Sequence, residues 1–164
     1  MTYVQDAALA FALVLSTAAL VWAAASDLTR YLIPNRACGL VAGGYAIALL
    51  GLPPGPWLAG LATGFAVLVL GAILFARGLV GGGDVKLAAA IALWAGPAFL
   101  SEFAFVTALA GVALAAVMLS PLRRLMPRRA GDEAAGGLKQ PMPFGAPLAA
   151  GGAWVLALQL SANL

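Results

Sequence analysis

The chain alternates long apolar runs with short segments rich in glycine, proline and charged residues. Because a membrane-spanning helix needs about 20 predominantly apolar residues, each run is a candidate span. The runs predict six helices, at about 4–25, 37–51, 57–76, 85–99, 101–120 and 145–162. The second and fourth contain only about 15 residues and extend some 22 Å, so they must be tilted, extended by their loops or sheltered by neighbouring helices.

The basic residues give independent information on orientation. All nine Lys and Arg residues lie on or beside alternate connections, after the first, third and fifth predicted helices. The positive-inside rule therefore places the segments at about 26–36, 77–85 and 121–144 in the cytoplasm and both termini outside. The prediction is an all-α polytopic membrane protein with about six transmembrane helices, forming one membrane-embedded domain over residues 1–164.

The composition agrees with this assignment and excludes several classes of chemistry. With 63% hydrophobic and 9% charged residues, the chain has too little polar surface to cover a water-soluble globule. The net charge of +3 arises from scattered clusters, which do not form a nucleic-acid-binding face. The chain has no histidine and a single cysteine, Cys38, which excludes histidine-dependent triads, internal disulfides and multi-cysteine metal cages. No cofactor is predicted, and Cys38 is interpreted as a small core residue.

Two acidic residues lie at the predicted cytoplasmic ends of helices. Asp27 follows the first apolar run, and Asp84 follows three glycines at the start of the fourth. A carboxylate beside hydrocarbon costs about 2.5–3.5 kcal/mol at a helix centre and less near the interface, so such residues are usually functional or paired. Alternatively, Asp27 is a solvated helix-end residue beside Arg30, and Asp84 is a helix cap. Their shared membrane face favours a functional pair.

A pair of carboxylates can hydrolyse a peptide bond without histidine or metal. Two close carboxylates cannot both ionise easily, so one keeps a proton while the other deprotonates a water that attacks the peptide carbonyl. The glycines before Asp84 lack the spacing of a phosphate-binding P-loop, and we interpret them as a segment that lets a peptide backbone approach. Lys86 is either a snorkelling topology anchor or a cation that tunes the pair electrostatically.

The sequence around both aspartates resembles the two-part signature of type IV prepilin peptidases. The first part is Ser26-Asp27-Leu28 with Ile33-Pro34-Asn35 shortly beyond, and the second is Gly81-Gly82-Gly83-Asp84-Val85-Lys86. A third element, Pro143-Phe144-Gly145-Ala146-Pro147, resembles the ending of the family, so the resemblance spans essentially the whole chain. It implies that Asp27 and Asp84 are the catalytic pair. The residues expected to shape the site are Pro34, Asn35, Gly81, Gly82, Gly83 and Lys86.

The resemblance also implies a substrate and a location. Family members are aspartic endopeptidases that cleave the short basic leader of prepilin-like or pseudopilin precursors at the cytoplasmic face of the bacterial inner membrane. The expected partners are these precursors and membrane lipid. Bifunctional members carry an additional domain with paired cysteines and methylate the new N-terminus, whereas this chain has only Cys38, so methyltransferase activity is not expected. The chain resembles the short members of Flp-type (tight-adherence) pilus systems, with archaeal preflagellin peptidases as an alternative.

A different class of function uses the same two aspartates. In a small proton- or cation-coupled transporter they would bind the coupling ion along a pathway. Such proteins place carboxylates or broken helices near the membrane midplane, whereas both aspartates lie at one end here and the middle of every predicted helix lacks charge. The protease is therefore the favoured hypothesis. The sequence leaves open which aspartate is the base and what the oligomeric state is.

Overall fold

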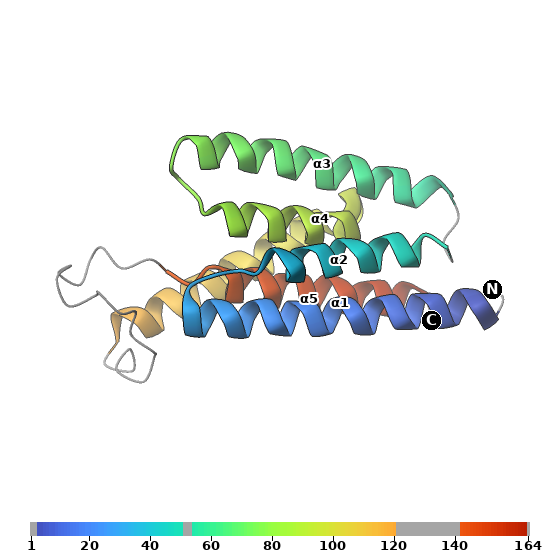
Figure 1. Cartoon of the computed structure of the whole chain (residues 1–164), viewed down its shortest axis with the longest axis horizontal. Coiled ribbons are helices and arrows are strands. Elements are labelled where there is room, and N and C mark those ends of the chain that lie inside the picture. The colour runs from blue at the N-terminus through green and yellow to red at the C-terminus, as the bar shows by residue number, and fades with distance from the viewer. Residues whose placement is uncertain (1–2, 51–53, 121–141, 164) are drawn as a thin grey trace.

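The computed structural model describes residues 3–50, 54–120 and 142–163, with the side chains of 54–57 left out. Over these ranges the chain forms a bundle of five helices (Figure 1). They are α1 (Tyr3–Arg30), α2 (Asn35–Ala48), α3 (Pro54–Ala76), α4 (Gly82–Leu119) and α5 (Gly145–Asn163). The all-α prediction is confirmed for this part of the chain. Most of the predicted loop at 121–144 lies outside the described residues.

Helix α4 reverses its direction at Gly96, where φ is 54° and ψ is −170°. Glycine adopts this left-handed φ without steric cost, and the next residue, Pro97, cannot donate a helical hydrogen bond. The first half of α4 runs along α3, and the second half returns along α5 (Figure 1). The helices predicted at 85–99 and 101–120 are thus the two halves of α4, and the turn comes earlier than the predicted boundary.

Helix α1 continues to Arg30, past the end of the apolar run at Ala25. Hydropathy marks where side chains leave an apolar environment, whereas the backbone hydrogen bonds of a helix can continue beyond that point. The helix stops at Arg30 because the next residue, Tyr31, has a left-handed φ of 52°. The N–H of Tyr31 donates to the carbonyl of Asp27 at 2.8 Å. The predicted loop at 26–36 therefore begins too early, because Asp27 lies inside the helix.

Two other boundaries differ from the prediction for related reasons. Helix α2 starts at Asn35, directly after Pro34, which has φ −65° and ψ 131°. Helix α4 starts at Gly82, so the predicted loop at 77–85 ends too late and Asp84 lies in the first helical turn. Glycine has a low helix propensity, but the tertiary contacts of α4 override this preference. In both cases, motif residues that were predicted to lie in a loop lie in the first turn of a helix.

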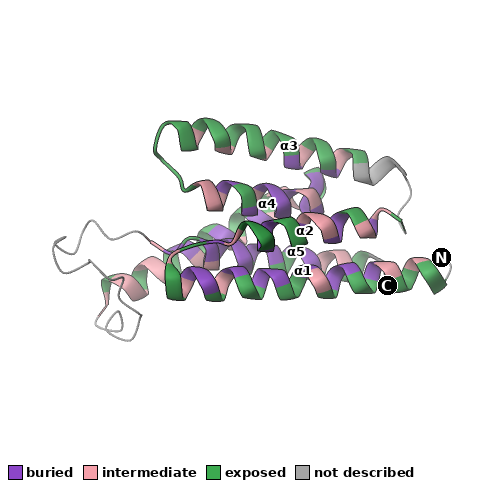
Figure 2. Ribbon diagram, in the orientation of Figure 1, coloured by how far each residue is buried: buried purple, intermediate pink, exposed green. Residues whose placement is uncertain are grey.

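The core lies between α1, α2, α4 and α5, which pack on one another through small residues. A Cβ atom on Gly152 of α5 would lie 2.9 Å from Cδ1 of Ile91 and 3.0 Å from Cδ1 of Leu20, so the absence of a side chain at Gly152 permits this close approach. Helix α3 packs mainly on α4, and its Gly60 also lies next to the Tyr45 side chain of α2. It is exposed along most of its length (Figure 2).

Within the described ranges, four helices are long and apolar enough to cross a membrane: α1, α3 from Leu58, α4 and α5. Large apolar side chains such as Phe65, Phe105 and Val112 are 67%, 70% and 68% exposed, which suits a lipid environment. The two marked chain ends lie at one end of the bundle, and the end of α1 and the start of α4 lie at the other (Figure 1). The number of membrane crossings and the location of the termini outside stay predictions.

Candidate active site

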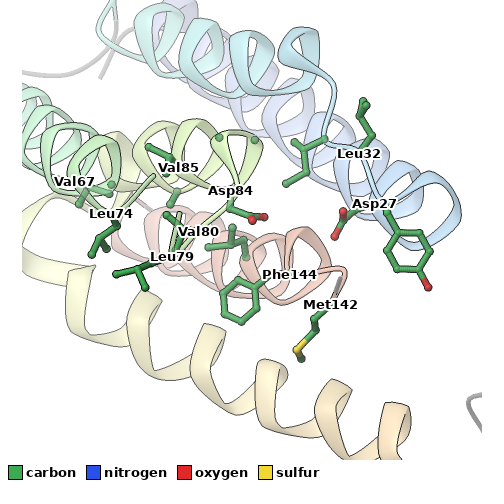
Figure 3. A pocket seen from close by; sticks show the side chains of 18 of the residues that line it. Asp27, Leu32, Val67, Leu74, Leu79, Val80, Asp84, Val85, Met142 and Phe144 are labelled. Carbon is green, nitrogen blue, oxygen red and sulfur yellow. The ribbon is translucent and has the colours of Figure 1, made fainter. Parts of the chain in front are cut away.

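A cavity of about 1190 Å³ lies where α1 ends and where α4 and α5 begin. Its lining includes both sequence-predicted aspartates, Asp27 and Asp84, which are far apart along the chain (Figure 3). Apolar side chains form much of the remaining wall. They come from α3, from the segment before α4 and from the start of α5: Val67, Leu70, Leu74, Leu79, Val80, Met142, Phe144 and Leu148. The cavity therefore combines a small carboxylate centre with an apolar surface, as ligand sites commonly do.

Asp27 is held by the first residues of α5. Its side chain is only 5% exposed, and the backbone N–H of Gly145 donates a hydrogen bond of 2.6 Å to its Oδ2 atom. The backbone of Ala146 also interacts with this carboxylate. Free N–H groups at a helix N-terminus favour a negative charge, so α5 supplies a suitable environment for Asp27. The alternative that Asp27 is a solvated helix-end residue is wrong, because its side chain is buried.

Gly145 is a glycine for a steric reason. A Cβ atom at this position would lie 2.8 Å from Oδ2 of Asp27 and 2.7 Å from Cδ1 of Ile33. Both distances are shorter than real carbon contacts allow, so any side chain would push the carboxylate or Ile33 aside. The start of α5 can approach Asp27 closely only because this residue has no side chain.

Asp84 lies in the first turn of α4 and interacts with the backbone of Gly81, the N-cap residue. A carboxylate that reaches back to an N-cap N–H is one half of a capping box, so the helix-cap interpretation of Asp84 agrees with the structure. This contact does not remove Asp84 from the cavity, because its side chain also lines the wall. A Cβ atom on Gly81 would lie 2.7 Å from Oδ2 of Asp84, which explains the glycine at that position.

The two carboxylates point toward one another across the cavity (Figure 3). They are near enough for a direct electrostatic interaction. One comes from the last turns of α1 and the other from the first turn of α4, and Ile33 lies next to both supporting segments: it contacts Gly145 and Gly83. The structure thus brings together the two aspartates that the sequence paired.

The predicted site-shaping residues occupy different places. Gly81, Gly82, Gly83 and Asn35 line the cavity. Pro34 is the N-cap residue of α2 and sets the start of that helix. Lys86 is exposed, and its Nζ atom donates to Oδ1 of Asn35 at 3.0 Å. This hydrogen bond joins the Ile-Pro-Asn motif to the Gly-x-Gly-Asp motif, a connection that the sequence did not indicate.

Sequence reasoning assigned no role to Ile33 or Gly145. Ile33 is 8% exposed and packs between the glycines that precede Asp84 and the start of α5. Ile33 belongs to the Ile-Pro-Asn motif and Gly145 to the Pro-Phe-Gly-Ala-Pro motif, and this membership is the sequence feature that could have indicated their role in the site. Hydropathy and charge carry no information about either contact.

The chain was also compared with known proteins. No curated protein and no solved structure matches it. The sequence model of the type IV leader peptidase family matches residues 9–116, which is more than half of the chain and includes Asp27 and Asp84. On the strength of this match, the chain belongs to the type IV leader peptidase family.

Proposed function

We propose that this protein is an aspartic endopeptidase of the membrane, with Asp27 and Asp84 as its catalytic pair, that removes the leader peptide of type IV prepilin-like precursors. The observation that carries the proposal is the convergence of these two carboxylates in one cavity of about 1190 Å³. They are the two acidic residues that lie within the quoted motifs. The family match favours this function over an ion-coupled transporter that uses the same aspartates.

The reaction follows from the properties of a carboxylate pair. The ionised aspartate accepts a proton from a water molecule as the water oxygen attacks the carbonyl carbon of the scissile bond. The protonated aspartate donates its proton to the carbonyl oxygen, which gives a neutral tetrahedral diol. Collapse of the diol restores the carbonyl, breaks the C–N bond and transfers a proton to the leaving amine. Because the two groups interact, their protonation belongs to the pair rather than to either residue.

The charge pattern supports a substrate and a side of the membrane. Basic residues flank the connections next to both aspartates, which agrees with a cytoplasmic site by the positive-inside rule. A short basic leader would remain on the same side for the same reason. We assign the precursor to the Flp-type class because the segment between the motifs around Asp27 and Asp84 contains one cysteine, Cys38, and not the paired cysteines of the bifunctional members. For the same reason we assign cleavage without methylation to this protein.

The proposal is tested by replacing each carboxylate with its amide. Asp27→Asn and Asp84→Asn keep the size of the side chain, and an amide oxygen can still accept the hydrogen bonds from Gly145 and Gly81. Purified protein is incubated in detergent or lipid with candidate prepilins, and the mass of each product is measured. Each variant should lose cleavage, by about 10³-fold or more, while it remains folded in the membrane fraction.

Asp6→Asn is the matched control, because Asp6 is an exposed carboxylate in the first turn of α1, at the other end of the same helix. This variant should process prepilin at the wild-type rate. Normal processing by Asp27→Asn or Asp84→Asn would refute the proposed mechanism. A product mass that includes an added methyl group would refute the assignment of cleavage alone.

A further inference from the structure

A second cavity, of about 500 Å³, lies between α2 and α3 with the first half of α4 as its floor. We name it the α2–α3 groove. Each of the three helices contributes four residues with the spacing i, i+3, i+4 and i+7, which is one face of an α-helix. On α3 this face extends from Leu61 to Leu68, and on α4 from Lys86 to Leu93. On α2 it consists of Asn35, Cys38, Gly39 and Ala42.

The groove is open because the backbones of its two walls stay apart. Helices α2 and α3 both pack on α4, and the side chain of Tyr45 on α2 reaches Gly60 on α3 just beyond the deep end of the groove. Small residues such as Gly39, Ala42 and Ala89 line the space between them. Small residues allow the backbones of membrane helices to approach closely. The three faces therefore form a largely apolar surface against which the backbone of another helix could pack closely.

The groove leads directly to the active-site cavity. Asn35 lines both cavities, and Lys86 at the same end of the groove lies two residues beyond Asp84. The hydrogen bond between Lys86 and Asn35 marks the polar end of an otherwise apolar surface. The opposite end, at Leu61 and Leu93, lies deeper along the helices. A peptide chain that occupies the groove would therefore emerge beside the two aspartates.

We propose that the α2–α3 groove receives the apolar, membrane-inserted helix of the substrate, on the far side of the cleaved bond from the basic leader. This inference rests on the proposed function. With the leader in water and the scissile bond at this end of the bundle, an apolar segment that follows the bond can continue into the bilayer along the groove. The stripe on each wall spans eight residues, about 10 Å or two helical turns, so the groove fixes the first part of that helix. Docking there holds the scissile bond at a constant distance from the carboxylates.

Filling the groove provides a first test. A Cβ atom on Gly39 meets nothing within 4 Å, so the position is open to a side chain, and Gly39→Leu adds apolar volume to the groove. We expect the KM for a full-length precursor to rise about tenfold or more, with kcat little changed, because binding rather than chemistry is affected. Ala104→Leu, on an exposed face of the second half of α4, is the control and should leave both constants unchanged. An unchanged KM in Gly39→Leu would overturn the proposal.

Cross-linking provides a second test that does not require cleavage. In an Asp84→Asn, Cys38→Ala background, Gly39→Cys faces the groove, whereas Leu40→Cys lies on the neighbouring surface, where the native leucine is 38% exposed. A precursor with a single cysteine in its apolar segment should form a disulfide with Cys at 39 at least about fivefold more than with Cys at 40. Equal yields would mean that lipid acyl chains occupy the groove and would overturn the proposal. Because docking is measured without turnover, its failure is distinguishable from failure of the peptidase assignment.

Discussion

The backbone N–H of Gly145 lies 2.6 Å from Oδ2 of Asp27 and donates a hydrogen bond to it, although 118 positions separate the two residues. The contact ties the last helix to the carboxylate of the first. It also positions Asp27 relative to the cavity, whose wall the buried side chain lines. The geometry of the aspartate pair therefore depends on the position of α5 as well as on α1 and α4.

Gly145→Ala tests this dependence. The added methyl group would lie 2.8 Å from Oδ2 of Asp27 and 2.7 Å from Cδ1 of Ile33, so the carboxylate, Ile33 or the start of α5 must shift. We expect cleavage to fall by about tenfold or more and the free energy of unfolding to fall by about 1–3 kcal/mol. Prepilin processing and unfolding in detergent measure the two effects. The control is Gly43→Ala, because a Cβ atom there meets nothing within 4 Å. Wild-type activity in Gly145→Ala would contradict the positioning role.

The hydrogen bond between Lys86 and Asn35 predicts a coupling between these residues. Lys86→Met keeps most of the apolar stem and removes the donor, and Asn35→Ala removes the acceptor. Because both residues are exposed, a double-mutant cycle of unfolding free energies should give a coupling of about 0.5–1 kcal/mol. The double variant should cleave no more slowly than the slower single variant. Lys86→Met combined with the distant Ser161→Ala should instead show additive free energies, and additivity in the Asn35 pair would refute the coupling.

Gly96→Ala should destabilise the reversal within α4. The φ of 54° and ψ of −170° at this residue are strained for any residue with a Cβ atom. We expect a loss of about 1–3 kcal/mol in the free energy of unfolding, which thermal unfolding in detergent would detect as a lower midpoint. The same substitution at Gly43, inside α2, should be neutral or stabilising, because alanine has the higher helix propensity. Equal midpoints for the two variants would be inconsistent with a left-handed residue at Gly96.

Ser26→Ala should weaken the turn that follows α1. The Oγ atom of Ser26 donates to the carbonyl of Leu32 at 2.8 Å, and this bond spans the left-handed residue Tyr31. Its loss should cost about 1 kcal/mol of unfolding free energy. Since Asp27 is the next residue, cleavage should also slow, although less than in Gly145→Ala. Ser161→Ala removes an exposed hydroxyl contact at the far end of α5 and serves as the control. Identical stability of the two variants would argue against the turn-stabilising role.

Hydropathy predicted the helices well because it measures the apolar character of consecutive side chains, and this character determines which segments form membrane helices. Apolar runs identified every helix of the described residues, including the two halves of α4. The same method misplaced the end of α1 and the start of α4. Those ends depend on local geometry, such as the left-handed φ of Tyr31, rather than on the transfer of side chains into lipid. Helix boundaries near polar segments are therefore the part of the fold that the sequence specifies least clearly.

The sequence predicted only part of the candidate site, because some of its contacts have no signal in the local sequence. The pairing of Asp27 with Asp84 followed from charge alternation, because both lie on the side with the basic connections. The support of Asp27 by Gly145 could not be predicted in this way, because a backbone donor has no side-chain signature and no charge. The contact of Lys86 with Asn35 likewise depends on the relative positions of α2 and α4, which no local pattern encodes.

The position of α3 at the edge of the bundle has a mechanical consequence. Helix α3 packs mainly on α4, with glycines such as Gly64 and Gly71 at the contact, yet it forms a wall of the active-site cavity and of the α2–α3 groove. A change in the tilt of α3 therefore alters the width of both spaces together. A helix that enters the groove from the lipid would lie against the same element that borders the aspartates, so occupation of the groove and access to the catalytic centre would be linked through α3.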